Sequence, residues 1–285
     1  MEPFPAVFVI APTGVYPVGI PLEATMREAI AAELWRLVRD YAARNALEMI
    51  WEPPLARCAD ARDPLFARLR ELLVPNHYLP EEYLPGARSV VSWFIPFKKA
   101  VADGNKEGFH CSAVWAQAYL NTNAMAAELN ERLAEGIRAR GGRAAVPRDA
   151  GMISREIIYS RWSQKHVAWI AGHGSFGLNN MLISDVGCVG RYYSIVTDLE
   201  TTADPRVREE RCLYKKNGTC GLCARQCPTG ALSTRGFDRR ICLEMCEKNE
   251  AVYPGADICG KCVVGLPCSF ADYARAGRGG RHGRD

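Results

Sequence analysis

Hydrophobic positions recur at helical spacing in three parts of this chain. Residues 22–45 alternate charged side chains with an apolar stripe, which predicts an amphipathic helix. The stripe consists of Met26, Ile30, Leu34, Leu37, Val38 and Tyr41. A second helix is predicted over residues 63–74. Ser112 is the expected N-cap of a third, longer helix, which ends at the Gly141-Gly142 pair.

Two other apolar segments have the length and composition of strands. Residues 89–95 form a β-rich run between Pro85-Gly86 and Pro96, which predicts a buried strand. Residues 190–199 predict another strand, and the apolar N-terminus, residues 1–10, predicts a first one. The pattern of residues 154–171 is ambiguous and is compatible with a helix or with irregular structure. The mixture indicates an α/β or α+β fold, with a cysteine-rich module after about residue 205.

Composition narrows the class without deciding the function. The 285 residues are 48% hydrophobic and 24% charged, which is ordinary for a globular protein. A net charge of +4 is too small to imply a nucleic-acid partner, and no apolar stretch is long enough to span a membrane. The N-terminus lacks the features of an export signal, so we expect a cytoplasmic protein. Thiols stay reduced there, which favours metal binding over disulfides.

The cysteines carry the clearest chemical signal. Nine of the twelve lie within residues 212–268. They include the run Cys220-Gly-Leu-Cys223-Ala-Arg-Gln-Cys227-Pro228, the C-x2-C-x3-C-P pattern of bacterial ferredoxins. In that pattern the cysteine before proline binds the other of two 4Fe–4S clusters. The sequence therefore predicts two clusters.

Two clusters need eight thiolates, which we assign in two interleaved groups. One group consists of Cys212, Cys220, Cys223 and Cys268. The other consists of Cys227, Cys242, Cys259 and Cys262. Cys246 is the surplus cysteine, although it could replace Cys242. A pair of structural zinc sites is the alternative, but zinc leaves Cys227-Pro228 unexplained.

The remaining cysteines, Cys58, Cys111 and Cys188, are expected to be buried small hydrophobic residues.

A glycine-rich segment precedes this module. Residues 172–177 read Gly-His-Gly-Ser-Phe-Gly, a match to the dinucleotide fingerprint G-x-G-x-x-G. That fingerprint needs a strand before it and a helix after it, whereas residues 178–184 predict a turn into a strand. The alternatives are a glycine turn packed closely inside the fold, or a backbone that lies against another flat cofactor.

The segment Trp169-Ile-Ala-Gly-His-Gly-Ser-Phe-Gly-Leu-Asn-Asn-Met-Leu-Ile183 resembles a segment of epoxyqueuosine reductases and corrinoid reductive dehalogenases. The order of three further segments agrees with this superfamily: residues 85–91, residues 220–232, and the isolated Cys242.

The resemblance implies an α+β fold with a nitroreductase-like, cobalamin-binding α/β domain over residues 1–204. A ferredoxin-like module with two 4Fe–4S clusters would follow over 205–273. The glycine- and arginine-rich composition of residues 274–285 separately predicts a basic, disordered tail. The resemblance also implies that the glycine-rich segment contacts cobalamin. The expected cofactor-binding residues are Gly172, His173, Gly174, Ser175, Phe176, Gly177, Asn179, Met181 and Leu182.

The resemblance is incomplete at the substrate site. Epoxyqueuosine reductases carry an aspartate, proposed as proton donor, where this chain reads Tyr159 to His166. Tyr159 and His166 are the candidate proton donors here, and Arg161 is a candidate for substrate orientation.

We therefore interpret the chain as a shorter relative, an oxidoreductase that delivers low-potential electrons through its clusters to cobalamin. The substrate would be small or borne by tRNA, and the electron donor a ferredoxin or flavodoxin. The alternatives are an accessory protein that reduces a partner's corrinoid and a flavin-dependent oxidoreductase.

Overall fold

The computed structural model describes residues 9–11, 14–16, 26–47, 50–149 and 151–270. Most of the predicted N-terminal strand and the whole predicted tail, 274–285, lie outside the described residues.

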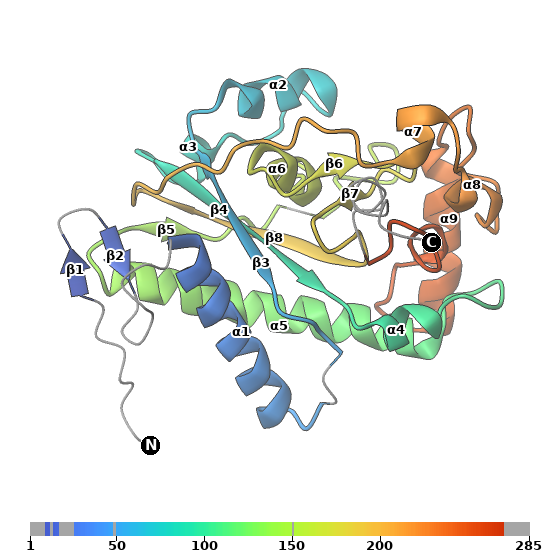
Figure 1. The fold of residues 1–285 in the computed structure, drawn as a ribbon, viewed down its shortest axis with the longest axis horizontal. Coiled ribbons are helices and arrows are strands. Elements are labelled where there is room, and N and C mark those ends of the chain that lie inside the picture. Colours follow the sequence, from blue (N-terminus) through green and yellow to red (C-terminus); the bar gives the residue numbers. More distant parts are fainter. Residues whose placement is uncertain (1–8, 12–13, 17–25, 48–49, 150, 271–285) are drawn as a thin grey trace, which may run out of the picture.

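The centre of the fold is a four-stranded antiparallel sheet (Figure 1). Its order is β3 (Leu55–Asp60), β4 (Ser89–Pro96), β8 (Gly190–Thr197) and β5 (Ala144–Ala145). All eight residues of β4 are buried, as the apolar run predicted. Two short antiparallel pairs lie outside this sheet: β1 (Val9–Ala11) with β2 (Gly14–Tyr16), and β6 (Ser175–Phe176) with β7 (Leu182–Ile183).

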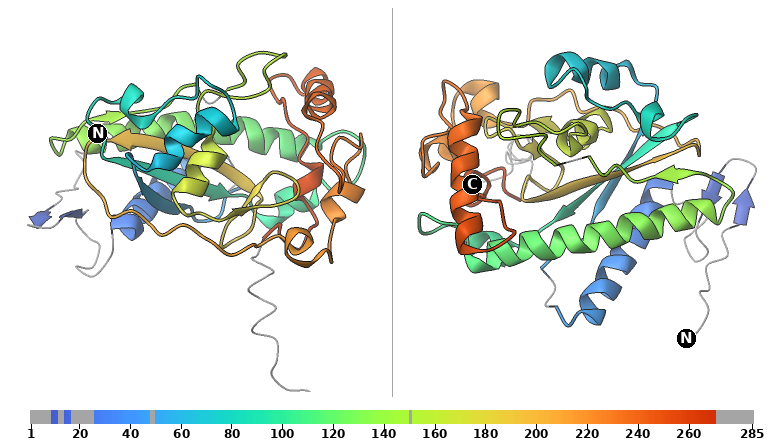
Figure 2. Two further views of the ribbon diagram at one scale, coloured as in Figure 1. Left: turned by 90° about the horizontal axis from the view of Figure 1, so that it is seen from above. Right: turned by 180° about the vertical axis from the view of Figure 1, so that it is seen from behind.

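Helices cover both faces of the sheet (Figures 1 and 2). Helices α1 (Met26–Arg44) and α5 (Ala113–Arg138) pack on one face, while α6 (Gln164–Ile170) and α2 (Pro64–Leu72) lie over the other. Two short helices complete this part, α3 (Pro80–Tyr83) and α4 (Lys99–Asp103). The mixed helix and strand composition predicted from sequence is confirmed.

Local sequence signals set the ends of several elements. The Ser112 Oγ accepts a hydrogen bond from the Trp115 amide nitrogen at 3.3 Å, which confirms Ser112 as the N-cap of α5. In α2, Asp63 caps the helix and Pro64 occupies its first turn. The ambiguous segment 154–171 is irregular in its first part and helical only in α6.

The cysteine-rich module lies at one end of the sheet (Figure 1). It contains α7 (Leu213–Asn217), α8 (Leu222–Arg225), α9 (Arg239–Val252) and the short 3-10 helix η1 (Lys261–Val263). Its residues Cys212, Ala256 and Val263 belong to the same hydrophobic core as Trp93 of β4. The module and the sheet therefore share one core, and the predicted division near residue 205 stays a prediction.

Across the described ranges, no helix is both long enough and apolar enough to span a membrane.

Candidate functional site

A cavity of about 900 Å³ lies between the sheet, α5, α6 and the cysteine-rich module. Its size is near the upper end of the range for ligand pockets. The wall includes Trp115, Tyr119 and Asn123 from α5, Gln164 and Lys165 from α6, and Arg191 and Tyr193 from β8. Met181, one of the predicted cofactor-binding residues, also lines it.

The module's share of this wall includes five cysteines: Cys227, Cys242, Cys246, Cys259 and Cys262. They are the four members of the second predicted group together with the surplus Cys246. Burial raises the pKa of Cys259 to about 11, and the pKa of Cys262 also rises, because a buried thiolate loses solvation. Binding to iron would offset this cost, since the ligand in iron–sulfur sites is the thiolate.

A second, smaller hollow contains the other four predicted ligands. Its wall includes Cys212, Cys220, Cys223 and Cys268. The structure thus separates the eight predicted cysteines into the two groups that the sequence spacing indicated. Their binding of clusters stays a prediction.

No group of three or more histidine, cysteine or acidic side chains in the described residues is placed to hold a single metal ion. A 4Fe–4S cluster presents four separate irons, so its thiolates surround a volume and need not converge on one point.

Cys242 and Cys246 face each other across one turn of α9. Their side chains are hydrogen-bonded, which lowers the pKa of Cys242 to about 7 and raises that of Cys246. The positive charges of Lys165 and Arg239 also lower the pKa of Cys242. Cys242 is therefore the better thiolate, and Cys246 the hydrogen-bond donor to it.

The isolated cysteines Cys58, Cys111 and Cys188 are all buried, as predicted. Cys188 also lines the cavity, and its amide nitrogen donates to the Cys268 carbonyl oxygen at 3.0 Å.

The glycines of the segment 172–177 pack against other parts of the backbone. A Cβ on Gly172 would lie 2.5 Å from the Pro205 carbonyl oxygen, and one on Gly174 would overlap the Ile183 carbonyl oxygen. A Cβ on Gly177 would lie 2.7 Å from the Asn179 Oδ1. The segment follows α6, contains β6 and precedes β7, so it lacks the preceding strand and the following helix of a dinucleotide site. This is the close glycine turn considered above.

Polar groups of the same segment hold the cysteine-rich module. The Ser175 Oγ accepts from the Arg211 amide at 3.0 Å, and the Phe176 carbonyl oxygen accepts from Lys215 Nζ at 2.7 Å. The Asn179 Nδ2 donates to the Cys262 carbonyl oxygen at 2.7 Å. Gly177 and Asn179 also border the hollow of the first cysteine group.

Of the predicted cofactor-binding residues, only Met181 lines the large cavity; cofactor contact by Gly172, His173, Gly174, Ser175, Phe176, Gly177, Asn179 and Leu182 stays a prediction.

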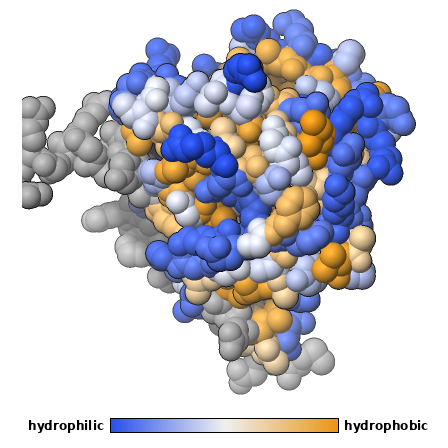
Figure 3. Space-filling view, turned by 90° about the vertical axis from the view of Figure 1, so that its right-hand side faces the viewer, coloured by the Kyte–Doolittle hydropathy of each residue, from blue (hydrophilic) through white to orange (hydrophobic). Residues whose placement is uncertain are grey.

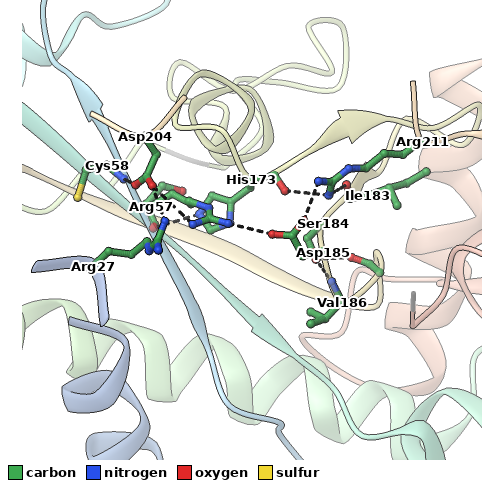
Figure 4. Close-up of polar contacts among 12 residues, drawn as sticks. Arg27, Arg57, Cys58, His173, Ile183, Ser184, Asp185, Val186, Asp204 and Arg211 are labelled. Atoms are coloured by element: carbon green, nitrogen blue, oxygen red, sulfur yellow. Dashed lines mark hydrogen bonds and ion pairs between the residues drawn. The ribbon is translucent and has the colours of Figure 1, made fainter. Parts of the chain in front are cut away.

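A partly buried network joins this segment to the sheet (Figure 4). Arg211 donates to the Ile183 carbonyl oxygen at 3.0 Å and to Asp185 at 2.7 Å. Asp185 also pairs with Arg57 of β3 at 2.9 Å. His173 approaches the Ser92 carbonyl oxygen at 3.1 Å through Nε2, and burial lowers its pKa to about 3. His173 is therefore a neutral core residue directed at the sheet.

Within the described residues, the cavity wall includes none of Tyr159, Arg161 and His166. Arg239 lies over the Tyr159 ring, with its Cζ 4.2 Å from the ring centre. His166 approaches the Ser163 Oγ at 2.7 Å and contacts the Phe176 ring. Burial lowers the pKa of His166 to about 4, so it is neutral at pH 7 and a poor proton donor.

Sequence reasoning missed three groups that do line the cavity. Lys165 Nζ donates to the Asn180 carbonyl oxygen at 3.0 Å, and burial lowers its pKa. Arg191 lies over the Tyr119 ring at 4.4 Å from its centre and donates to the Tyr193 hydroxyl at 3.1 Å. The Tyr193 hydroxyl in turn donates to Asn123 Oδ1 at 2.9 Å. The available signal was the alternation of β8, which places Arg191 and Tyr193 on one face.

Solved structures similar to this one belong to the superfamily that the sequence resembles. An epoxyqueuosine reductase from Streptococcus thermophilus matches with a TM-score of 0.52 and 16% identity, over 84% of this chain and 65% of that one. The chain has the fold of this superfamily.

Two structures of reductive dehalogenases agree with this assignment. A catabolic enzyme matches with a TM-score of 0.52 and 18% identity, over 79% of this chain and 31% of that one. A second structure, described with a mechanism for B12-dependent dehalogenation, matches with a TM-score of 0.51 and 19% identity over the same shares. The chain thus spans less than two thirds of the length of these proteins. No protein-family model and no curated protein matches the sequence.

Proposed function

We propose that this protein is an iron–sulfur oxidoreductase that uses cobalamin to reduce a small organic substrate. The observation that carries the proposal is the shared wall of the large cavity. Cys227, Cys242, Cys259 and Cys262 line it on one side, and the polar groups of α6 and β8 line it on the other. A cluster bound by these cysteines would lie directly beside the space in which a substrate is reduced.

The cavity suits a large cofactor rich in amide groups, such as cobalamin. Trp115 Nε1 is buried at the wall and has no hydrogen-bond partner among the described residues. It can donate to an amide carbonyl of the cofactor, as can Lys165 Nζ. Bound cobalamin would supply the reactive cobalt, and the protein supplies binding and orientation.

The chain's own residues then have defined roles. Arg191 is held over Tyr119 and presents a fixed positive charge, which can orient an anionic or polar substrate. Tyr193 and Lys165 replace Tyr159 and His166 as candidate proton donors, because both line the cavity. The lowered pKa of Lys165 brings its proton nearer to the range useful at neutral pH.

The proposal is tested by anaerobic reconstitution with iron, sulfide and hydroxocobalamin. We expect about eight irons per chain, consistent with two 4Fe–4S clusters, and a corrin spectrum that persists through gel filtration. Four irons or fewer would contradict the two-cluster assignment. Zinc content equal to two ions per chain would support the structural alternative.

The same experiment separates the alternative functions. Eight irons with retained flavin and no corrin would favour a flavin-dependent oxidoreductase. Eight irons without either cofactor would favour an accessory protein that reduces a partner's corrinoid. As a matched pair, Lys165→Met should weaken corrin retention while Lys248→Met, on the exposed side of α9, should leave it unchanged.

A further inference from the structure

Three cysteines of the first group lie in a segment whose charged residues are all basic. From Arg211 to Phe237 the chain contains five basic residues and no acidic one. This segment alone therefore carries more positive charge than the +4 of the whole chain. Arg211 is buried, whereas Lys215, Lys216, Arg225 and Arg235 are all exposed.

Contacts between the short elements bring α7, α8 and the turn at Thr234 together. The Tyr214 hydroxyl of α7 donates to the Thr234 carbonyl oxygen at 3.4 Å, next to Arg235. A Cβ on Gly221, at the start of α8, would meet Arg225, Thr234 and Tyr214 within 3.7 Å. Arg225 thus borders the turn Cys220-Gly221, which holds one predicted cluster ligand. Arg235 follows Thr234 along the chain, and Lys215 and Lys216 lie on the neighbouring α7, where Lys216 Nζ is 3.6 Å from Glu209. We call this surface, formed by α7, α8 and the turn at Thr234, the basic face.

The basic face also contains an exposed apolar side chain. Leu222 is 36% exposed, although it directly precedes the buried Cys223. Figure 3 shows the side of the molecule on which the cysteine-rich module lies, where hydrophilic and hydrophobic side chains alternate. Protein interfaces combine polar and apolar side chains of this kind. The aromatic side chains of the segment, Tyr214 and Phe237, are only partly exposed, so the face offers little for stacking RNA bases.

The two cysteine groups differ in what they face. The second group lines the large cavity, where the substrate would bind. The first group lies behind the basic face and lines only its own small hollow. Electrons that leave at the second group would therefore enter at the first.

We propose that the basic face is the docking site of a small acidic one-electron carrier protein. This inference rests on the proposed function, since it requires a cluster at the first cysteine group. In each encounter the carrier loses one electron and the cluster gains it, and no bond is formed or broken. Complementary charge would accelerate the encounter at low salt and would be screened as ionic strength rises.

The test uses a flavodoxin of net negative charge as the reduced carrier and the reconstituted full chain as the acceptor. Cluster reduction is followed by anaerobic stopped-flow absorbance across a range of salt concentrations. We expect the wild-type rate to fall with salt, and the variant K216E/R225E/R235E to react about tenfold more slowly at low salt. The neutral variant K216Q/R225Q/R235Q should fall between the two.

A control variant, R44E/R68E/R132E, makes the same change in net charge on α1, α2 and α5, and should react as the wild type does. Iron content and the rate of reduction by dithionite report whether the clusters of each variant are intact. The docking site is wrong if K216E/R225E/R235E has normal iron content, is reduced by dithionite at the normal rate, and is reduced by flavodoxin as fast as the wild type.

Calorimetric titration of flavodoxin into each protein tests docking separately from electron transfer. If the wild type lacks iron, the proposed function fails, while a binding difference between the variants still supports the basic face. An RNA hairpin is titrated in the same way. If it binds the wild type more tightly than flavodoxin does, and K216E/R225E/R235E no longer binds it, then the partner of the basic face is RNA and not the carrier protein.

Discussion

Arg211 Nη2 lies 2.7 Å from Asp185 Oδ1, and the Arg211 side chain is only 1% exposed. The same guanidinium binds the Ile183 carbonyl oxygen, and the next residue along the chain is Cys212. Asp185 is itself paired with Arg57 of β3 (Figure 4). The chain that enters the cysteine-rich module is thus anchored to the sheet immediately before its first predicted cluster ligand.

Replacement of Arg211 by alanine should loosen this anchor. It removes a donor from the His173 and Ile183 carbonyl oxygens and one of the two cationic partners of Asp185, which keeps Arg57. Leaving a buried acceptor without its donor costs about 1–3 kcal/mol. We expect a lower free energy of unfolding in denaturant titration and a loss of the iron bound by the first cysteine group. Arg206→Ala is the control, because its pair with Asp63 is 39% and 24% exposed and should contribute less than about 1 kcal/mol. Equal decreases in the free energy of unfolding in Arg211→Ala and Arg206→Ala would argue against the anchor.

Gly174 should not tolerate a side chain. A Cβ there would overlap the backbone of Ile183, and a strand backbone cannot move aside as a flexible side chain can. We expect Gly174→Ala to destabilise the fold by about 1–3 kcal/mol or more, as overpacked cores do. Gly236→Ala is the matched control, since nothing lies within 4 Å of its added methyl group. Thermal unfolding of both apo-proteins checks this, and a Gly174→Ala variant as stable as the wild type would show that β6 and β7 can separate.

The two cysteines of α9 should respond differently to replacement. Cys242 has the lowered pKa and Cys246 the raised one, because Cys246 donates the hydrogen bond between them. Cys242→Ala should therefore remove about four irons, whereas Cys246→Ala should retain about eight and change the reduction potential of the second cluster. Iron analysis and a redox titration distinguish the two. Loss of iron in Cys246→Ala with retention in Cys242→Ala would reverse the assignment of the ligand.

The features that the sequence predicted are mostly those determined by residues close together along the chain. The buried strand β4 and the cap at Ser112 follow from patterns within a few residues, and both are confirmed. The sheet order β3-β4-β8-β5 depends on pairing between distant segments and had no local signal. The grouping of cysteines was predictable because ferredoxin spacing is a strong constraint on geometry.

The glycine-rich segment shows the limit of such reasoning. Its sequence fits both a cofactor contact and a close packing of backbone, since both need the absence of a side chain. The structure shows the close packing, with Gly172 against the Pro205 carbonyl oxygen and Gly174 against that of Ile183, while the cofactor contact stays a prediction. Lys165 was missed for a related reason. It lines the cavity together with Cys242 and Cys246 of α9, and α9 lies more than seventy residues further along the chain.

The buried histidine beside Lys165 gives the protein a specific acid sensitivity. Burial, and then the charge of Lys165, lowers the pKa of His166 to about 4, below the usual value of about 6.5. Between these values the unfolded chain binds a proton that the folded chain does not, so folding stability must fall as the pH drops from about 6.5 towards 4. At pH 5 the loss from this group is about 2 kcal/mol.

The variant His166→Gln cannot take up this proton, so its stability should depend less on pH than that of the wild type. Other groups contribute to both proteins, including His77 and His173, whose pKa values are also lowered by burial. The difference between the two denaturation profiles therefore isolates His166. Parallel profiles from pH 7 to pH 5 would mean that His166 titrates normally in the folded protein, and its role as a proton donor would again deserve a direct test.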